Sequence, residues 1–232
     1  MQQHETIEAY IQAIAIYNTT LKFNPNDLKA LKRKGYALEK LSELQLEQEQ
    51  HDDAIVSLKQ AIATFDVAFS LIPTDAEAIS YKGMVIERLA QLYSSRLQYA
   101  QALSTLSQAV AAYNTAIYFA GDDFCNHALK ANALESIADL QLNLSDYTQS
   151  IENYKMAIAH YETSLWLKPM KVNTFALGQT LSKLGNCQEQ LLQKSEALRN
   201  YHAALSLFNS ALPPGDKHIR YVTQKIQKLV SS

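Results

Sequence analysis

The chain has 232 residues, of which 47% are apolar and 19% are charged, a composition that can form a sizeable core and excludes a disordered segment of low hydrophobicity. A formal net charge of -2 provides no strongly basic field, so we expect no nucleic-acid partner. No apolar run approaches the ~18 residues of a membrane span, so we expect no membrane partner. The start of the sequence lacks the features of a secretion signal, and the two cysteines, which have no metal-type spacing, fit a reducing compartment. We therefore expect a cytoplasmic protein.

Helix-forming residues dominate the whole chain, because Ala, Leu, Gln and Glu are abundant and only six Gly and five Pro occur. The first expected element is a lone helix over residues 1–23, which ends in the segment AIAIYNTTLKFNP. It is similar to the second half of each later repeat, but no first half precedes it. We therefore expect either another chain or residues outside this sequence to cover its exposed apolar side.

Four copies of one unit follow the opening helix, over residues 24–72, 73–120, 121–168 and 169–215. Each copy predicts a hairpin of two helices of roughly 20 residues, about 30 Å long. The expected signals for helix starts are Asn26, Thr74 and Ser145. The turn residues of the four copies are 48 positions apart, and the fourth copy then loses one residue: Pro25, Pro73, Gly121 and Pro169.

The second helix of each copy has a small residue at every seventh position. A small side chain at this spacing stays on one stripe and lets a neighbouring backbone come close. An aromatic residue follows the middle small residue by four positions and lies on the same face, so we expect it to anchor the core. The small residues are Ala54, Ala61, Ala68; Ala102, Ala109, Ala116; Ser150, Ala157, Ser164; and Ala197, Ala204, Ala211, and the aromatics are Phe65, Tyr113, Tyr161 and Phe208.

These features resemble the tetratricopeptide repeat, whose second helix has a small residue, an aromatic four later and a following Pro, and whose first helix has a Gly at a close helix contact. The first full copy matches at Gly35, Ala61, Phe65, Ala68 and Pro73. The resemblance covers almost the whole chain and implies a single all-α domain, a right-handed superhelical solenoid of antiparallel helical hairpins. The unit is longer than the usual one of about 34 residues, and we assign the excess as one heptad to each helix. An expected aromatic is replaced by Leu31, Ile79 and His127, and an expected Leu by Lys34, Lys82 and Lys130.

The last expected helix covers residues 216–232, with the sequence DKHIRYVTQKIQKLV in it. Its apolar residues make a single stripe, formed by Ile219, Val222, Ile226 and Leu229. A repeat array needs a terminal element with a polar outer face, so we expect this helix to cap the fourth repeat.

The sequence offers little support for catalysis, a cofactor or a metal. It has no Gly-rich phosphate loop, no His-Glu-x-x-His and no nucleophile elbow. Asp122, Asp123, Cys125 and His127 are the one conceivable group of metal ligands, and they motivate an enzyme only as a third alternative. The interpretation that we favour is structural: the two Asp begin a helix, and His127 fills the helix interface at the position of Leu31 and Ile79.

A stripe of the first helices is the expected binding surface, because the matching stripe lines the concave groove of tetratricopeptide proteins. The groove should begin partly basic, become acidic through Glu39, Glu87 and Glu135, and end in apolar side chains. The candidate partner-binding residues are Lys29, Lys32, Tyr36, Glu39, Met84, Glu87, Asn132, Glu135, Phe175 and Gln179.

Two interpretations of the three Glu remain open. They are either an ordinary solvated face or a row of acceptors for an extended or helical partner segment of basic or amide-rich character, with Asn132 holding the partner's backbone. We therefore predict a non-catalytic scaffold that binds another protein in its groove. The alternative is a structural module that forms homo-oligomers, in which the opening helix meets its equivalent or the closing helix of another chain.

Overall fold

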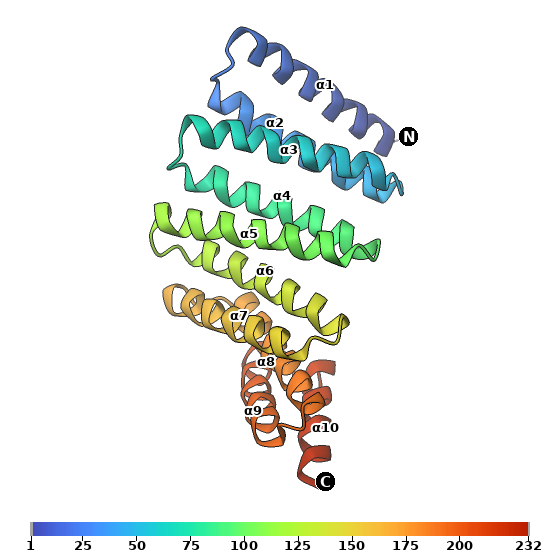
Figure 1. Ribbon diagram of the computed structural model, residues 1–232, viewed down its shortest axis with the longest axis vertical. Coiled ribbons are helices and arrows are strands. Elements are labelled where there is room, and N and C mark those ends of the chain that lie inside the picture. Colours follow the sequence, from blue (N-terminus) through green and yellow to red (C-terminus); the bar gives the residue numbers. More distant parts are fainter. Residues whose placement is uncertain (1, 232) are drawn as a thin grey trace. The chain divides into compact units, whose positions relative to one another are not determined.

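The computed structural model describes the backbone of residues 2–231 and the side chains of residues 6–231. The described residues form ten α-helices and no strand (Figure 1). The helices are α1 (Gln2–Phe23), α2 (Leu28–Glu47), α3 (His51–Leu71), α4 (Ala76–Ser95), α5 (Tyr99–Ala120), α6 (Phe124–Asn143), α7 (Tyr147–Leu167), α8 (Lys171–Gln190), α9 (Lys194–Ala211) and α10 (Lys217–Ser231).

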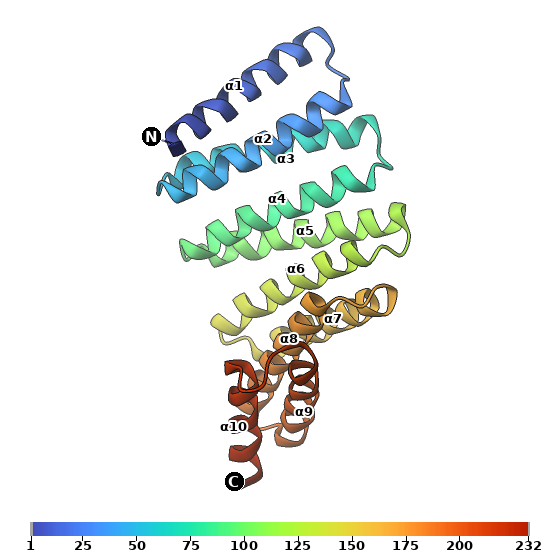
Figure 2. The ribbon, with the colours of Figure 1, turned by 180° about the vertical axis from the view of Figure 1, so that it is seen from behind.

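The chain divides into two compact units, Met1–Gly121 and Asp122–Ser232, where the sequence predicted one domain. The first unit contains α1 and the hairpins α2/α3 and α4/α5, and the second contains the hairpins α6/α7 and α8/α9 and the final helix α10. In the first unit α1 lies at the edge, beside α2, in both ribbon views (Figure 1, Figure 2).

Aspartates begin five of the described helices, because a carboxylate at the helix start accepts a hydrogen bond from a free backbone N–H of the first turn. Asp27 accepts from the N–H of Ala30 at 2.9 Å, and Asp75 accepts from that of Ala78 at 3.0 Å. Two predicted N-caps, Asn26 and Thr74, therefore lie one residue too early. The same holds for Ser145, since the N-cap of α7 is Asp146.

The turns inside the hairpins contain a residue in the left-handed conformation, although none of these residues is Gly. Their φ angles are between 57° and 61°, at Glu49, Leu97, Ser145 and Leu192. In the first turn the N–H of Gln50 donates to the carbonyl of Gln45 at 2.8 Å, which satisfies a carbonyl at the end of α2. A left-handed residue thus ends each first helix and turns the chain into the second.

The predicted aromatic anchors are confirmed, because all four are at most 1% exposed. Three of the four hairpins are closed at this point by contact of the aromatic ring with a Gly of the first helix. A Cβ atom added to Gly35 would lie 2.6 Å from the ring of Phe65, and one added to Gly178 would lie 2.7 Å from Phe208. In these three hairpins only Gly allows the helices to approach this closely, so the Gly and the aromatic set the spacing together.

The core of the first unit surrounds α3, which lies between α2 and α4. Ala54, Leu58, Ala61, Phe65 and Ala68 of α3 are fully buried. Among the described residues, α3 is the one helix that is long and apolar enough to cross a membrane by length and composition. Its apolar residues form this core instead, as is common in the central helix of a helical array.

In the second unit α10 covers α9. Val222 is fully buried against a cluster that includes Tyr201 and Phe208, and the other three residues of its apolar stripe pack against the same cluster. Lys217, Arg220 and Gln224 lie on the outer face and are exposed. This arrangement leaves a polar surface at the end of the chain.

Candidate functional site

A cavity of about 310 Å³ opens on the first helices of the first unit, within the predicted binding stripe. Its walls come from α2 and α4, the first helices of two consecutive repeats. Three of the predicted partner-binding residues, Tyr36, Glu39 and Met84, line it. We call it the tyrosine pocket, and its lining residues are Tyr36, Glu39, Lys40, Tyr81, Met84, Val85 and Arg88.

Aromatic packing fixes one wall of the tyrosine pocket. The rings of Tyr36 and Tyr81 meet edge to face with their centroids 4.5 Å apart, and Tyr36 also packs against the core residue Phe65 at 5.6 Å. Burial raises the pKa of Tyr36 well above its usual value, so its phenol stays protonated at neutral pH. Tyr81 and the flexible side chain of Met84 remain partly open and offer apolar contact area to a ligand.

The charged residues at the rim of the tyrosine pocket are paired with one another. The Nε of Arg88 donates to Glu39 at 2.7 Å, and its terminal nitrogen lies 2.5 Å from Glu43. Lys40 is 2.7 Å from the other oxygen of Glu43. Two cations therefore neutralise two carboxylates, which leaves the apolar floor of the pocket as the part that is open to a partner.

The basic start of the groove is also paired within the chain. Lys32 donates to Asp75 at 3.1 Å and to Glu77, so its side chain bridges α2 to the beginning of α4. Lys29 is exposed. Of the two predicted lysines, only Lys29 therefore projects into solvent.

Glu87 is buried, and this corrects the expectation that it lines the groove. It is 9% exposed and accepts a hydrogen bond from the hydroxyl of Tyr113. Burial raises the pKa of Glu87 to about 7, and the hydrogen bond from Tyr113 opposes this shift. A buried phenol needs an acceptor, and Glu87 satisfies that need inside the hairpin.

Glu135 also accepts hydrogen bonds from its own unit. Tyr161 donates to it at 3.1 Å, Thr180 at 3.0 Å and Lys183 at 2.6 Å. The first repeat differs because its aromatic is Phe65, which has no hydroxyl, and there Glu39 pairs with Arg88 instead. The change from Phe to Tyr at the anchor position was the sequence signal that a Glu of the same hairpin would be used internally.

The other predicted residues of the second unit lie around the hairpins α6/α7 and α8/α9. Asn132 is exposed, and its side-chain oxygen accepts a hydrogen bond from Tyr161. Phe175 is half-buried against Phe208 and His218, with ring centroids 5.8 Å and 5.1 Å away. Gln179 is partly exposed on α8. None of these residues lines the tyrosine pocket.

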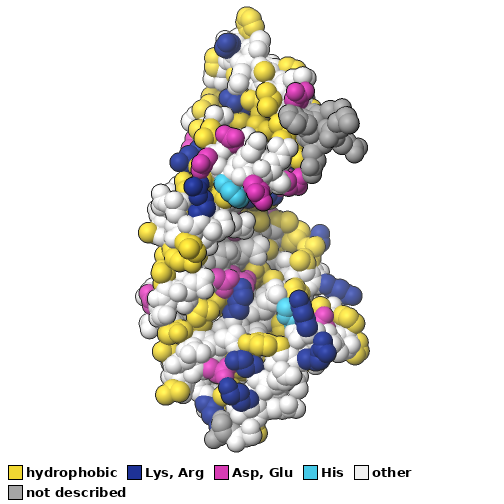
Figure 3. All heavy atoms as spheres, turned by 90° about the vertical axis from the view of Figure 1, so that its right-hand side faces the viewer, with side chains coloured by type: hydrophobic (Ala, Val, Ile, Leu, Met, Phe, Trp, Pro, Cys, Tyr) yellow, Lys and Arg dark blue, Asp and Glu magenta, His cyan; other side chains and the backbone are white. Residues whose placement is uncertain are grey.

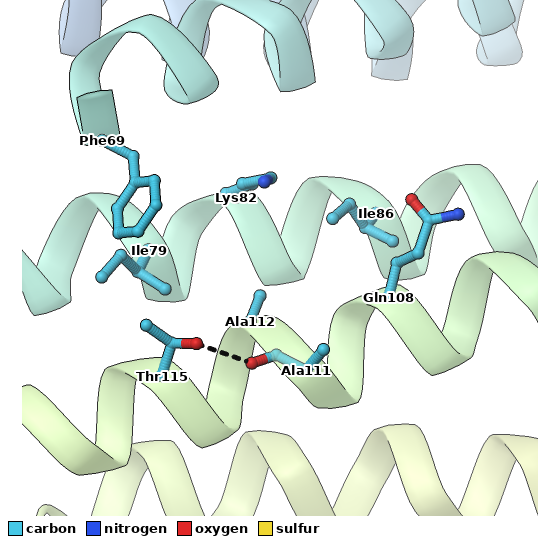
Figure 4. A pocket seen from close by; sticks show the side chains of 8 residues that line it. All are labelled: Phe69, Ile79, Lys82, Ile86, Gln108, Ala111, Ala112 and Thr115. Atoms are coloured by element: carbon cyan, nitrogen blue, oxygen red, sulfur yellow. Dashed lines mark hydrogen bonds between the residues drawn. The ribbon is translucent and has the colours of Figure 1, made fainter. Parts of the chain in front are cut away.

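A second cavity of the first unit, of about 280 Å³, lies between α3 and α5 with α4 as its floor (Figure 4). Ile79 and Ile86 form the floor, and Lys82 there is paired with Asp66. The α5 side consists of short side chains, and the hydroxyl of Thr115 donates to the carbonyl of Ala111 at 3.0 Å. None of the predicted partner-binding residues lines this cavity.

The possible metal ligands near the start of α6 have other contacts. Asp123 caps α6 by accepting from the N–H of Asn126 at 3.1 Å. His127 is buried with its Nδ1 3.0 Å from the Nδ1 of His160, and burial, Lys130 and His127 lower the pKa of His160 to about 4. Cys125 is exposed. Within residues 6–231, no three His, Cys, Asp or Glu side chains are grouped so that they could hold a metal ion.

No protein-family model and no curated protein matches the sequence. Several solved structures are similar. BtubC (BKLC) from P. vanneervenii has a TM-score of 0.65 and 14% identity, over 100% of this chain and 89% of that chain. MamA has a TM-score of 0.44 and 20% identity, over 87% of this chain and 90% of that one. TTC0263, a thermophilic TPR protein in Thermus thermophilus, has a TM-score of 0.40 and 15% identity, over 99% and 100%.

The hairpins and the first of these similarities define an all-α helical-repeat protein. More particularly, the chain has a tetratricopeptide-like fold, as the pattern of Gly, small and aromatic residues predicted.

Proposed function

We propose that this protein is a non-catalytic scaffold that binds another protein, and that the tyrosine pocket holds an apolar or aromatic side chain of the partner. The observation that carries the proposal is the contrast inside this pocket. Its charged rim residues neutralise one another, while Tyr81 and Met84 expose apolar surface above a rigid aromatic wall.

The partner suggested by the structure differs from the basic or amide-rich segment inferred from the three Glu. Glu39, Glu87 and Glu135 each accept hydrogen bonds or ion pairs from the chain itself. A basic partner would have to displace these donors, whereas an apolar side chain could enter the tyrosine pocket without breaking any of them. An apolar anchor flanked by backbone hydrogen bonds is the partner that this surface favours. The cytoplasm remains the predicted location.

The proposal is tested by selecting peptides from a random displayed library on the native chain and measuring their affinity for variants. We expect the selected peptides to share an aromatic or large aliphatic residue. Tyr81→Ala removes one wall of the pocket and should weaken binding ~10-fold or more, since a truncated anchor contact in a binding pocket has this effect.

The matched control is Tyr118→Ala, which removes an aromatic that is 80% exposed on the same unit but outside the pocket. It should leave affinity unchanged, and circular dichroism should show both variants fully helical. Peptides without an apolar residue in common, or equal affinity for the native chain and Tyr81→Ala, would refute the proposal.

A further inference from the structure

The opening helix α1 has only one neighbour, whereas the equivalent helix α3 has two. α3 lies between α2 and α4, and five of its residues are fully buried. α1 packs against α2 alone, and none of its described side chains is buried. Figure 3 shows yellow apolar side chains at the α1 end of the first unit, with few charged side chains among them. A helix face that is buried in every other repeat is therefore open here.

The open face is a regular seam with a spacing of three and four residues. In α3 the matching residues face the first helix of the same repeat: Ser57 donates to Gln45 of α2 at 2.8 Å, and Thr64 is 7% exposed. Forty-eight positions earlier stand Ala9 and Ile16, and Ile16 is 64% exposed. A three-four spacing marks one stripe that suits a partner helix. The seam, which we call the α1 seam, consists of Thr6, Ala9, Ala13, Ile16, Thr20 and Phe23.

The residue at position 9 disfavours, as the cover of this face, a first helix that has Gln at the facing position. In three hairpins a polar side chain at this position donates to a Gln of the first helix: Ser57 to Gln45, Asn153 to Gln141 at 2.9 Å and Asn200 to Gln188 at 2.7 Å. Ala9 has no such group. In the hairpin α4/α5 the same two positions are Tyr93 and Thr105, so only a first helix with Gln there would lack this donor on α1, while an apolar helix would lose nothing.

We infer that the α1 seam pairs with the α1 seam of a second copy of this chain, antiparallel and about a two-fold axis between Ile14 and Ala15. In this register each of the six residues meets another of the six. A small residue always faces a larger one: Thr6 faces Phe23, Ala9 faces Thr20 and Ala13 faces Ile16. Such self-complementarity is what an isologous two-fold interface requires.

The distribution of charge favours a second α1 seam, rather than the closing helix α10 of another chain, as the partner of the α1 seam. The α1 seam contains no charged residue, so pairing two copies of it desolvates no ion and brings no like charges together. The outer face of α10 carries exposed Lys217 and Arg220, which would lose water against an apolar seam. Each seam extends along about 25 Å of its helix, and the two seams lie side by side over this length. We therefore expect a small and readily reversible dimer interface.

The test is sedimentation velocity of the full chain from about 1 to about 200 µM, the range in which a small interface dissociates. The mean mass should rise toward that of a dimer. Ile16→Glu places a charge in the seam and should raise the dissociation constant ~10-fold or more. Ile11→Glu is the matched control, because Ile11 is 51% exposed on the same helix but outside the seam, and its dimer should match the native one. A native chain that stays monomeric throughout, or two variants of equal effect, would overturn the inference.

The register is tested separately by disulfide trapping, with Cys125→Ser in both chains to remove the exposed thiol. An equal mixture of Ala13→Cys and Ile16→Cys chains should cross-link more completely than either chain alone. More complete linking of Ala13→Cys to itself would indicate a parallel pair and refute the antiparallel arrangement.

Discussion

At the scale of single residues, the anchor aromatics determine how the neighbouring carboxylates are used. The hydroxyl of a buried Tyr requires an acceptor, and in α4 that acceptor is Glu87, a carboxyl group removed from water. Phe65 makes no such demand, and Glu39 of its hairpin instead reaches Arg88. The presence or absence of a hydroxyl group on the anchor ring thus determines whether the Glu of that hairpin is buried, as Glu87 is, or lies at the rim of the tyrosine pocket, as Glu39 does.

Glu87 should make the stability of the protein depend on pH. Its pKa is raised from 4.5 to about 7 in the folded chain, mainly by burial. Below pH 4.5 the group is protonated in both states, and between pH 4.5 and 7 only the folded state retains the proton, so the free energy of unfolding falls as pH rises. Glu87→Gln retains an acceptor for Tyr113 without the charge, and it should be more stable than the native chain by about 1–3 kcal/mol at about pH 8.

Urea unfolding of both proteins at about pH 5 and about pH 8, on either side of the raised pKa, measures this difference. Glu39→Gln is the control, because it removes a carboxylate that pairs with Arg88 and should lower stability instead. The assignment to Glu87 fails if Glu87→Gln gains no stability at the higher pH relative to the lower one.

At the scale of the elements, the hairpin turns contain the clearest backbone strain. Leu192 has a φ of 57° and is 90% exposed, so its side chain has no packing that would explain the left-handed conformation. A residue with a Cβ is disfavoured there by about 1–2 kcal/mol, while Gly adopts it freely. The strain is tolerated because the helices on both sides of the turn fix the direction of the chain.

Leu192→Gly should therefore stabilise the protein by up to about 1 kcal/mol, after the greater backbone freedom of Gly in the unfolded chain is deducted. Thermal unfolding followed by circular dichroism measures the change. Leu191→Gly is the neighbouring control: Leu191 has a φ of -93°, so the same substitution should destabilise. Destabilisation by both substitutions would show that the turn stores no strain at Leu192.

At the scale of the whole molecule, each of the two units contains a core of its own. The core of the first unit is built around α3, and those of the second around Tyr154 and around Tyr201 and Phe208. All residues that line the tyrosine pocket, and the whole α1 seam, belong to the first unit. The proposed binding site and the proposed dimer interface therefore belong to one half of the chain.

A fragment of residues 1–121 should consequently fold and keep both properties. We expect a cooperative unfolding transition, a helical circular dichroism spectrum and affinity for a selected peptide within about twofold of the full chain. A fragment that is unfolded, or one that is folded but has lost the peptide, would show that the second unit is needed for the site.

The sequence alone determined the helices, their pairing into repeats and the aromatic anchors, because these depend on periodicity and on residue size. Residues about 3, 4 and 7 apart share a helix face whatever surrounds them, so Ala61 and Phe65 could be assigned to one face from spacing, whereas the close contact at Gly35 was what the tetratricopeptide resemblance implied. The tetratricopeptide-like fold followed from the same pattern.

Only the tertiary structure decided which polar side chains are free. The stripe rule assigned Glu39, Glu87 and Glu135 equal places, yet each has different partners, because partners depend on what the neighbouring helix presents within about 3 Å. The pocket between Tyr36 and Tyr81 and the left-handed residues of the turns likewise depend on distances between elements. Periodicity fixes the direction in which a side chain points, but the packing of one helix on the next fixes what it meets.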